Sequence, residues 1–264
     1  MPTVTVLEKL YGSGVPETFE NQYSDLVSGL EVQLRLVGAT DRGWMQLEVS
    51  GEDETAALSL LEQEVGLAPV SLDKLKKFSS VQGKVVFSGK SKEELYVDFG
   101  VFSPQVTDAV VSGKQLCAHL ADGKNIPLPE LIELFCLYDN MPLEVKITED
   151  LKEAKTHVGA VLSEAQVSLF RKWVRCRFDR LIVLGSLLSD VEEAVKLSRH
   201  SRDIIRVESL GALEHVILCK LGTDAVGLIP KLGRYIKTSV LVPFSPKKIL
   251  EAVGSQSFGL RLYL

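Results

Sequence analysis

Basic and aromatic side chains alternate in the segment RKWVRCRFDR, residues 171–180. Its basic members are Arg171, Lys172, Arg175, Arg177 and Arg180. Such side chains neutralise phosphates, and the rings of Trp173 and Phe178 offer faces on which bases stack, so the segment predicts contact with RNA. The alternative is a solvated helix end with both rings in the core. It is favoured by a Ser163–Gln166 capping box and by the preference of cations for helix C-termini.

A second candidate site follows the apolar run HVILC. It consists of Lys220, Gly222 and Thr223. Backbone N–H groups at a helix start bind anions, and in that case the chain is an enzyme acting on a phosphorylated small molecule. The alternative is a plain strand-to-helix turn, capped by Thr223 or Asp224, with Gly222 at positive φ. Pro230 then lies in the first turn of the helix, and the charge of Asp224 favours this alternative.

Other catalytic motifs are missing from the sequence. GKVVFSGKS, residues 83–91, has five residues between its glycines, where a P-loop has four. His215 and Cys219 lie on one strand pattern, which separates them by roughly 13 Å. There is no HExxH, GxSxG or paired-carboxylate signature, and the four cysteines form no CxxC pair. We therefore expect no catalytic residues, no cofactor and no metal.

Charge is distributed unevenly along the 264 residues, although the net charge is only −5. Residues 1–78 carry 6 basic and 13 acidic side chains, residues 79–176 carry 11 and 13, and residues 177–264 carry 13 and 9. A polyanion should therefore meet the C-terminal part first, whereas a basic protein partner would fit the acidic N-terminal part. No signal peptide or apolar run long enough for a membrane span is present, so we expect a cytoplasmic protein.

The two ends of the chain have the same predicted order of elements. At the N-terminal end, TVTVLEKLY alternates as a strand, residues 17–30 have helical spacing, and residues 32–36 and 45–49 form a hairpin before an acidic helix start at residues 52–54. At the C-terminal end, RLIVLGS is a strand, Ser189 and Glu192 form a capping box, two strands follow, and a short helix covers residues 227–236 before the strand SVLVPF. Both ends predict ferredoxin-like βαββα(β) domains.

The middle of the chain has a different pattern. It contains five short strands, and the helix PELIELFCLYD, residues 129–139, lies between the third and the fourth. This order is typical of a small five-stranded barrel.

The middle segment resembles an S1-like member of the OB-fold barrels. The resemblance rests on GKV at residues 83–85, YVDFG at residues 96–100, DAVVS at residues 108–112 and VLS at residues 161–163. S1 barrels commonly bind RNA through aromatic side chains on exposed strands, and by position Tyr96 matches a stacking aromatic residue. Val110 stands where many RNA-binding members have histidine, and Glu93 stands at an upstream aromatic position.

The whole chain also resembles an archaeal family of uncharacterised proteins classed as a domain of unknown function. GEDETAALSLLEQEVGLAP, DRLIVLG and HVILCKLGTDAVGLIPKLG carry this resemblance, which implies an archaeal origin and supplies no activity.

These observations predict an α+β protein with three domains: a ferredoxin-like domain over residues 1–78, an S1-like OB barrel with an inserted helix over residues 79–176, and a second ferredoxin-like domain over residues 177–264. The expected function is a non-enzymatic RNA-binding or ribonucleoprotein-associated adaptor. It would use Tyr96 and the basic segment. The alternatives are a protein–protein interaction scaffold and the phosphate-binding enzyme described above.

Overall fold

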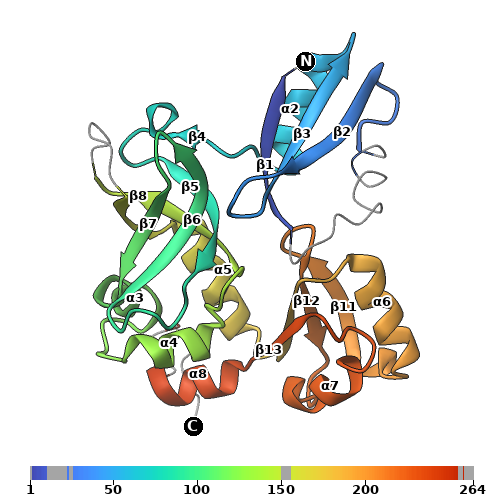
Figure 1. The fold of residues 1–264 in the computed structure, drawn as a ribbon. Helices are drawn as coiled ribbons and strands as arrows, with labels where there is room; N and C mark the ends of the chain where they lie inside the picture. Colours follow the sequence, from blue (N-terminus) through green and yellow to red (C-terminus); the bar gives the residue numbers. More distant parts are fainter. Residues whose placement is uncertain (1, 11–22, 24–25, 150–155, 255–257, 259–264) are drawn as a thin grey trace.

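The computed structural model describes residues 2–10, 23, 26–149, 156–254 and 258, and these form a mixed α+β protein. Three sheets follow one another along the chain, with helices packed against them (Figure 1). In this view the N-terminal sheet lies at the upper right, beside the upper part of the central sheet and above the C-terminal sheet.

The N-terminal sheet has three antiparallel strands in the order β1-β3-β2. They are β1 (Thr3–Lys9), β2 (Val32–Ala39) and β3 (Trp44–Gly51). The alternating hairpin predicted from residues 32–49 is therefore confirmed. Helix α2 (Glu54–Glu64) follows and buries Ala57 and Leu61. Most of the helix predicted over residues 17–30 lies outside the described residues.

The central sheet contains six strands in the order β4-β6-β5-β8-β9-β7, with an additional pairing of β6 with β7. They are β4 (Val70–Ser71), β5 (Ser80–Val86), β6 (Glu94–Ser103), β7 (Thr107–Ser112), β8 (Pro142–Ile147) and β9 (His157–Leu162), and the short helix η1 (Leu72–Lys74) follows β4. Among themselves, the strands β5 to β9 each pair with two others, in the ring order β5, β6, β7, β9, β8 and back to β5, and β6 pairs with β4 as well.

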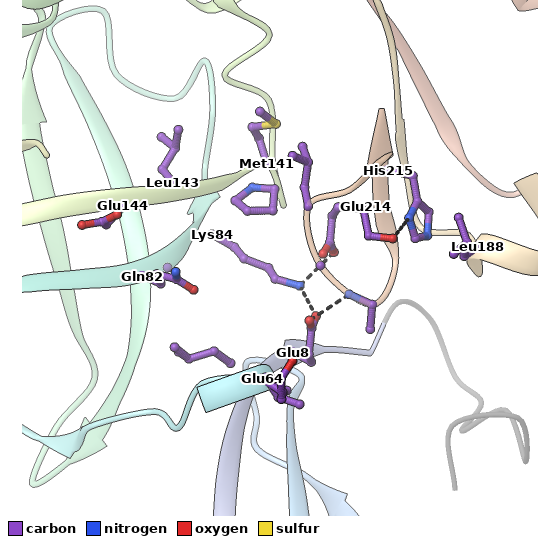
Figure 2. Close-up of a pocket in the computed structure, with 18 of the residues that line it drawn as sticks. Glu8, Glu64, Gln82, Lys84, Met141, Leu143, Glu144, Leu188, Glu214 and His215 are labelled. Carbon is purple, nitrogen blue, oxygen red and sulfur yellow. Dashed lines mark hydrogen bonds and ion pairs between the residues drawn. The ribbon is translucent and has the colours of Figure 1, made fainter. Parts of the chain in front are cut away.

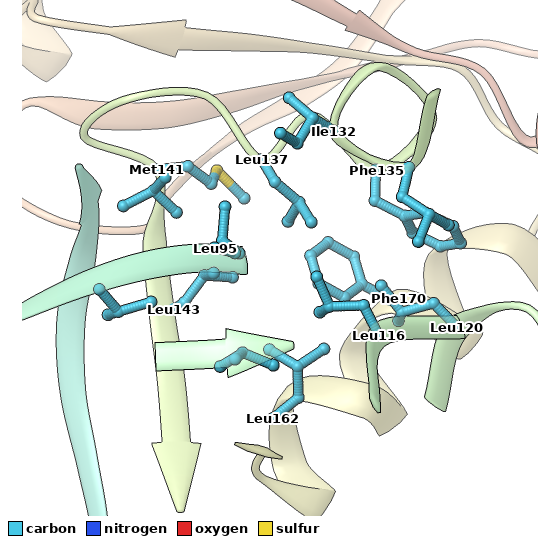
Figure 3. Close-up of a cluster of buried hydrophobic side chains, with 14 of the residues drawn as sticks. Leu95, Leu116, Leu120, Ile132, Phe135, Leu137, Met141, Leu143, Leu162 and Phe170 are labelled. Carbon is cyan, nitrogen blue, oxygen red and sulfur yellow. The ribbon is translucent and has the colours of Figure 1, made fainter. Parts of the chain in front are cut away.

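Two helices connect β7 to β8, where the sequence predicts one. Helix α3 (Gly113–Leu120) begins with a full capping box between Ser112 and Gln115, and α4 (Leu128–Phe135) ends at Cys136 in the left-handed conformation. Their apolar sides meet Leu95, Leu143 and other residues from inside the ring of strands (Figure 3). The apolar residues that alternate along the strands and those that recur at helical spacing thus form one continuous buried core.

Helix α5 (Glu164–Arg175) connects the central sheet to the C-terminal sheet. Ser163 caps it as predicted by accepting a hydrogen bond from the backbone N–H of Gln166. The Gln166 side chain does not complete the box, because its Oε1 accepts from the backbone N–H of Glu144 at 3.1 Å.

The C-terminal sheet has the antiparallel order β11-β12-β10-β13. Its elements are β10 (Arg180–Leu184), α6 (Leu188–Leu197), η2 (Ser201–Asp203), β11 (Ile204–Ser209), β12 (Glu214–Cys219), α7 (Ala225–Leu232), β13 (Val240–Phe244) and α8 (Pro246–Val253). Leu181 and Val183 pack in a cluster with α6 and α7, whereas Ile182 and Leu184 pack into the core of the central part. All five residues of β10 are buried because both faces of this sheet are covered.

Three details of the C-terminal prediction are wrong. Helix α6 begins at Leu188 without any side-chain cap, so the Ser189–Glu192 capping box does not form. Helix α7 begins at Ala225, which places Pro230 inside the helix rather than in its first turn. The chain also continues past β13 into α8, whose Pro246 occupies the first turn.

Candidate functional site

Tyr96 lies on the outer face of β6, where its side chain is partly exposed. Its hydroxyl donates a hydrogen bond to Oε2 of Glu94 at 2.8 Å, and its ring meets the ring of His157 edge to face at a centroid distance of 5.3 Å. Tyr96 is paired with Val86 on β5 and Val110 on β7, and both of these side chains are also partly exposed. A ring in this position is open to a stacking partner.

Phe87 directly follows Val86, the last residue of β5, which is paired with Tyr96. It is 36% exposed, and two cations lie over its ring: the Arg42 guanidinium at 5.0 Å and the Lys90 ammonium at 4.0 Å from the centroid. We call Arg42, Phe87, Lys90, Tyr96 and His157 the aromatic–cation cluster. The sequence pattern indicates only a strand at Phe87 and a turn at Arg42, so neither is predicted as a site residue.

Three charged residues form a row across the strands on the same outer face, two residues along β6 from Tyr96. Lys84 on β5 pairs with Asp98 on β6, which pairs with Asp108 on β7. Each side chain is at most 4% exposed, because the N-terminal sheet covers the row with opposite charges. The matching pairs are Glu8 with Lys84 at 3.0 Å, Lys9 with Asp98 at 2.6 Å and Arg42 with Asp108 at 3.3 Å. Trp44 adds a hydrogen bond from Nε1 to Asp98 Oδ1 at 2.9 Å.

The row of Lys84, Asp98 and Asp108 lies next to the row that contains Tyr96. The N-terminal sheet covers the first row and leaves Tyr96 accessible. Because strand side chains alternate between the two faces, these outward residues lie opposite the buried Val85, Val97 and Ala109 of the core. The outer face of the central sheet is thus divided between the contact with the N-terminal sheet and a partly exposed strip that contains Tyr96.

The C-terminal sheet also reaches the covered row. Glu214 at the start of β12 accepts from the Lys84 ammonium at 2.8 Å, and the backbone N–H of Ala212 donates to Glu8 Oε1 at 2.8 Å. Burial and the nearby Glu214 carboxylate raise the pKa of Glu8, although Lys84 opposes this. Burial alone would lower the pKa of Lys84, but the Glu214 and Glu8 carboxylates outweigh it and the pKa is raised. Lys84 therefore stays protonated while it joins all three sheets.

A cavity of about 1030 Å³ opens where the three sheets meet (Figure 2). Glu8, Lys84 and Glu214 form part of its wall, and Met141 and Leu143 supply apolar surface from the central part. His215 lines it from β12 and is 1% exposed, with Nε2 2.9 Å from the Ser186 carbonyl oxygen and Nδ1 3.2 Å from Ser209 Oγ. Burial lowers the pKa of His215.

His215 and Cys219 make no catalytic pair. Both lie on β12, and His215 is bonded to Ser186 and Ser209, whereas the Cys219 thiol lies near the carbonyl oxygen of Ile217. Burial also raises the pKa of Cys219 to about 12. The thiol is therefore protonated at neutral pH and is a poor nucleophile.

The basic segment of residues 171–180 divides into exposed and buried members. Arg171, Lys172, Arg175 and Arg177 are exposed, and Arg175 Nε donates to the Phe258 carbonyl oxygen at 2.8 Å. Arg180 is 5% exposed, and its guanidinium donates to the carbonyl oxygens of Trp173 and Phe178. The expectation that Arg180 contacts RNA is therefore corrected, because its side chain is turned inward.

Trp173 is only 3% exposed and packs against Phe170 and Phe244, so it belongs to the core and offers no face to a base. Tyr96 interacts with Glu94 and His157, and none of its hydrogen bonds or ring contacts with other described residues reaches the basic segment. Helix α5 instead packs against α8, α3 and β8. The two expected halves of the RNA site thus lie on different elements with different packing partners.

The turn at residues 220–224 forms the plain strand-to-helix connection. Gly222 has a φ of +86°, and Asp224 caps α7 by accepting from the backbone N–H of Val226 at 2.9 Å. A second carboxylate, Asp179, accepts from the backbone N–H of Ala225 at 3.4 Å. Lys220 and Thr223 lie on either side of Gly222 and are joined by a backbone hydrogen bond. Because carboxylates already occupy the first N–H groups of α7, the turn is poorly suited to a phosphate.

The described residues contain no group of three His, Cys, Asp or Glu side chains placed to hold a metal ion. No helix in the described part of the chain is long and apolar enough to cross a membrane.

Comparison with known families matches both ends of the chain. A model of the DUF2110 N-terminal domain matches residues 3–69, and a model of the DUF2110 C-terminal domain matches residues 178–243. The first contains Glu8, Lys9 and Arg42, and the second contains Glu214. No curated protein matches the sequence significantly.

Proposed function

The chain belongs to the DUF2110 family, a family of unknown function, and we propose that it is a non-enzymatic RNA-binding protein that acts as an adaptor in ribonucleoprotein assemblies. The proposed RNA is single-stranded at the contact, because stacking on protein rings requires bases that are not stacked on each other. A cytoplasmic location and an archaeal origin are part of the proposal.

The strand orders support the finer fold assignment within this proposal. The ring order of β5 to β9, with helices between the third and fourth strands, is the order of an S1-like OB barrel. The order β11-β12-β10-β13 supports a ferredoxin-like C-terminal domain. In the N-terminal domain, the order β1-β3-β2 and the isolated bridge from Val6 to Leu67 beside β1 support the same assignment. We retain residues 1–78, 79–176 and 177–264 as the proposed domains.

The observation that carries the proposal is the aromatic–cation cluster on the open part of the barrel face. Phe87, Tyr96 and His157 offer three rings, and Arg42 and Lys90 lie over the ring of Phe87. Stacking is tolerant of base identity because every base has a π-face, whereas cations contact the phosphates between bases. The exposed Lys90 side chain is flexible, so a base can replace it over the Phe87 ring.

The exposed Arg171, Lys172, Arg175 and Arg177 form a second proposed RNA contact, and Arg180 is removed from the set. Because the basic segment lies on α5 and the turn after it rather than on the strands that carry Tyr96, we assign it to phosphate contact with a longer or structured RNA. Such contacts carry no base preference and weaken steeply with salt.

Fluorescence anisotropy with a labelled single-stranded RNA of about 12 nucleotides, at roughly 50 and 200 mM salt, tests the proposal. The double variant Phe87→Ala/Tyr96→Ala should weaken binding about tenfold or more at both salts, since a stacked base contributes on the order of 1–3 kcal/mol. Arg171→Glu/Arg175→Glu should weaken binding and reduce its salt dependence.

Tyr235→Ala is the matched control, because Tyr235 is a 47% exposed tyrosine that belongs neither to the aromatic–cation cluster nor to the basic segment. It should bind RNA like the unmodified protein. If the unmodified protein shows no salt-dependent binding, or if all variants bind equally, the proposal is wrong.

A protein–protein interaction scaffold remains the second candidate. Glu52, Glu62 and Glu64 are exposed around α2 and form an acidic surface for a basic partner. A pull-down with and without nuclease separates the two functions, since an association mediated by RNA is lost after nuclease treatment and a direct one is not. An enzyme acting at residues 220–224 is the weakest candidate, because Asp224 and Asp179 hold the helix start.

A further inference from the structure

The C-terminal sheet ends in β11, a strand with one open edge. In the order β11-β12-β10-β13, β11 pairs only with β12 among the described strands. Ile205 is 45% exposed on it, and the side chain of Arg206 is 64% exposed. The strand at the opposite end of the sheet, β13, contains Pro243, a residue type that protects sheet edges from further pairing. The edge of β11 is therefore the place where another strand can add to this sheet.

The hydrogen bonds of β11 show which of its backbone groups face outward. The N–H of Leu210, just after β11, donates to the carbonyl oxygen of Glu214 on β12 at 2.8 Å. In an antiparallel pair the N–H and C=O groups of alternate residues point to the same neighbour, so those of Glu208 and Arg206 also point to β12. The groups of Val207, between them, point away from β12. Val207 thus directs one donor and one acceptor toward a further strand.

The charges on β11 are self-complementary. Arg206 and Glu208 lie on one face of the strand, on either side of Val207, and they form an ion pair through Arg206 Nε and Glu208 Oε1. A second β11 that pairs antiparallel, with Val207 opposite Val207, places each Arg206 opposite Glu208 of the other copy. A guanidinium has more N–H donors than one carboxylate uses, so its Nη groups can bond the second carboxylate while Nε keeps the first.

Other registers of the same pairing bring like charges together. Because only alternate residues direct their backbone groups outward, the second strand can slip only in steps of two residues. A slip in one direction places Arg206 opposite Arg206, and a slip in the other direction places Glu208 opposite Glu208. Like charges directly opposite each other destabilise a strand pair, so the two charges select the register centred on Val207.

We propose that β11 is a dimer interface, at which β11 of a second copy of this chain pairs antiparallel about a two-fold axis at Val207. The two C-terminal sheets then form one continuous sheet, and the symmetry repeats each Arg206–Glu208 contact. A contact made by one pair of strands is small, so the dimer is weak, with a Kd of about 10–100 µM. The interface contains no member of the aromatic–cation cluster or the basic segment, so this proposal does not depend on RNA binding.

Sedimentation equilibrium of nuclease-treated protein, from about 5 to about 500 µM, tests the proposal. The unmodified protein should be in monomer–dimer equilibrium. Arg206→Glu and Glu208→Arg each place like charges opposite each other at both symmetric positions, and each should weaken the dimer at least about tenfold. The double variant Arg206→Glu/Glu208→Arg brings opposite charges together again and should dimerise like the unmodified protein.

A mixture of the two single variants gives the sharpest result. The acidic strand of Arg206→Glu and the basic strand of Glu208→Arg are complementary, so the mixture should form a heterodimer although neither variant dimerises well alone. Loss of folding in either variant cannot produce this result. Arg234→Glu, at an exposed arginine after α7, is the matched control and should leave the dimer unchanged.

Val207→Pro tests the backbone contact independently of the charges. It removes the outward N–H and keeps the residues that bond β12, and proline is tolerated on edge strands, so this variant should fold and be monomeric. The proposal is overturned if the unmodified protein is monomeric up to about 500 µM, if the charge reversals leave association unchanged, or if their mixture does not associate. A dimer that persists in Val207→Pro is held by another surface and also contradicts the proposal.

Discussion

Lys84 and Glu214 are 130 residues apart in the chain, yet the Lys84 ammonium lies 2.8 Å from Glu214 Oε1. Glu8, 76 residues before Lys84, accepts from the same ammonium at 3.0 Å. All three side chains are buried, at 9% exposure or less. Burying charges costs free energy that their attraction only partly returns, so this contact is better understood as setting the arrangement of the three sheets than as a large source of stability.

Replacing the shared cation should destabilise the protein strongly. Lys84→Met leaves the Glu8 and Glu214 carboxylates buried without it, and we expect a loss of about 3–5 kcal/mol in the free energy of unfolding. Urea unfolding followed by circular dichroism measures it. Lys92→Met, at an exposed lysine on the loop before β6, is the control and should stay within about 0.5 kcal/mol of the unmodified protein.

Removing the carboxylate charges together with the cation should restore most of the lost free energy of unfolding. In the triple variant Lys84→Met/Glu8→Gln/Glu214→Gln no buried charge remains in the contact, and the new amide at position 8 still offers an oxygen to the Ala212 N–H. A Lys84→Met variant as stable as the unmodified protein, or a triple variant no better than the single one, would show that the three charges are not coupled.

Arg180 should matter for stability and not for RNA. Arg180→Gln leaves the carbonyl oxygens of Trp173 and Phe178 without their shared donor and removes the cation from the Trp173 ring, and we expect a loss of about 1–3 kcal/mol. RNA affinity of the folded protein should be unchanged. The exposed Arg171→Gln should behave in the opposite way, with unchanged stability and weaker RNA binding. If Arg180→Gln is fully stable but binds RNA poorly, Arg180 belongs to the RNA site after all.

Asp224 should act as a helix cap rather than as part of an anion site. Asp224→Ala removes the acceptor of the Val226 N–H, and we expect it to cost about 1 kcal/mol, with Thr223→Ala as a neighbour that costs less than about 0.5 kcal/mol. Thermal unfolding with and without inorganic phosphate checks both points. Stabilisation by phosphate that disappears in Lys220→Ala would contradict this account.

His215 should make stability depend on pH. Its folded-state pKa is lowered by burial below the ordinary 6.5, so the unfolded chain binds the proton more readily. The contribution of the neutral His215 to the free energy of unfolding is therefore complete above pH 6.5. It is lost as the pH falls toward the folded-state pKa of His215. Urea unfolding at about pH 7.5 and about pH 5.5 should show a smaller loss for His215→Gln than for the unmodified protein. His119, whose pKa is also lowered by burial, contributes separately, and His119→Asn measures its share. An identical pH dependence in His215→Gln and in the unmodified protein would contradict the assignment.

The local elements can be predicted from the sequence because their signals are local. Alternation at residues 32–49 predicts the β2–β3 hairpin, and Ser163 with Gln166 predicts the start of α5. Helix α3 is not predicted from the sequence, because its Ser112–Gln115 capping box directly follows a strand, with no intervening loop residues. Helix α8, residues 246–253, is not predicted either, because the apolar strand SVLVPF matches the last strand of the ferredoxin-like pattern.

The candidate site can be predicted only in part. A family resemblance identifies Tyr96 and spacing identifies the exposed arginines, whereas Phe87 and Arg42 meet only through the packing of two separate sheets. The row of Lys84, Asp98 and Asp108 depends on strand register, and its partners Glu8, Lys9 and Glu214 are distant in the chain. Arg180 is misassigned from the sequence because spacing cannot distinguish an arginine bound to backbone carbonyls from one in solvent.

Ultraviolet crosslinking of the protein to a uridine-rich single-stranded RNA, followed by identification of the crosslinked peptides, tests the RNA proposal most directly. We expect crosslinks at Phe87, Tyr96 or His157, and their loss in Phe87→Ala/Tyr96→Ala while Tyr235→Ala retains them. Crosslinks confined to other surfaces, or none with RNA bound at low salt, would contradict a nucleic-acid contact at the aromatic–cation cluster.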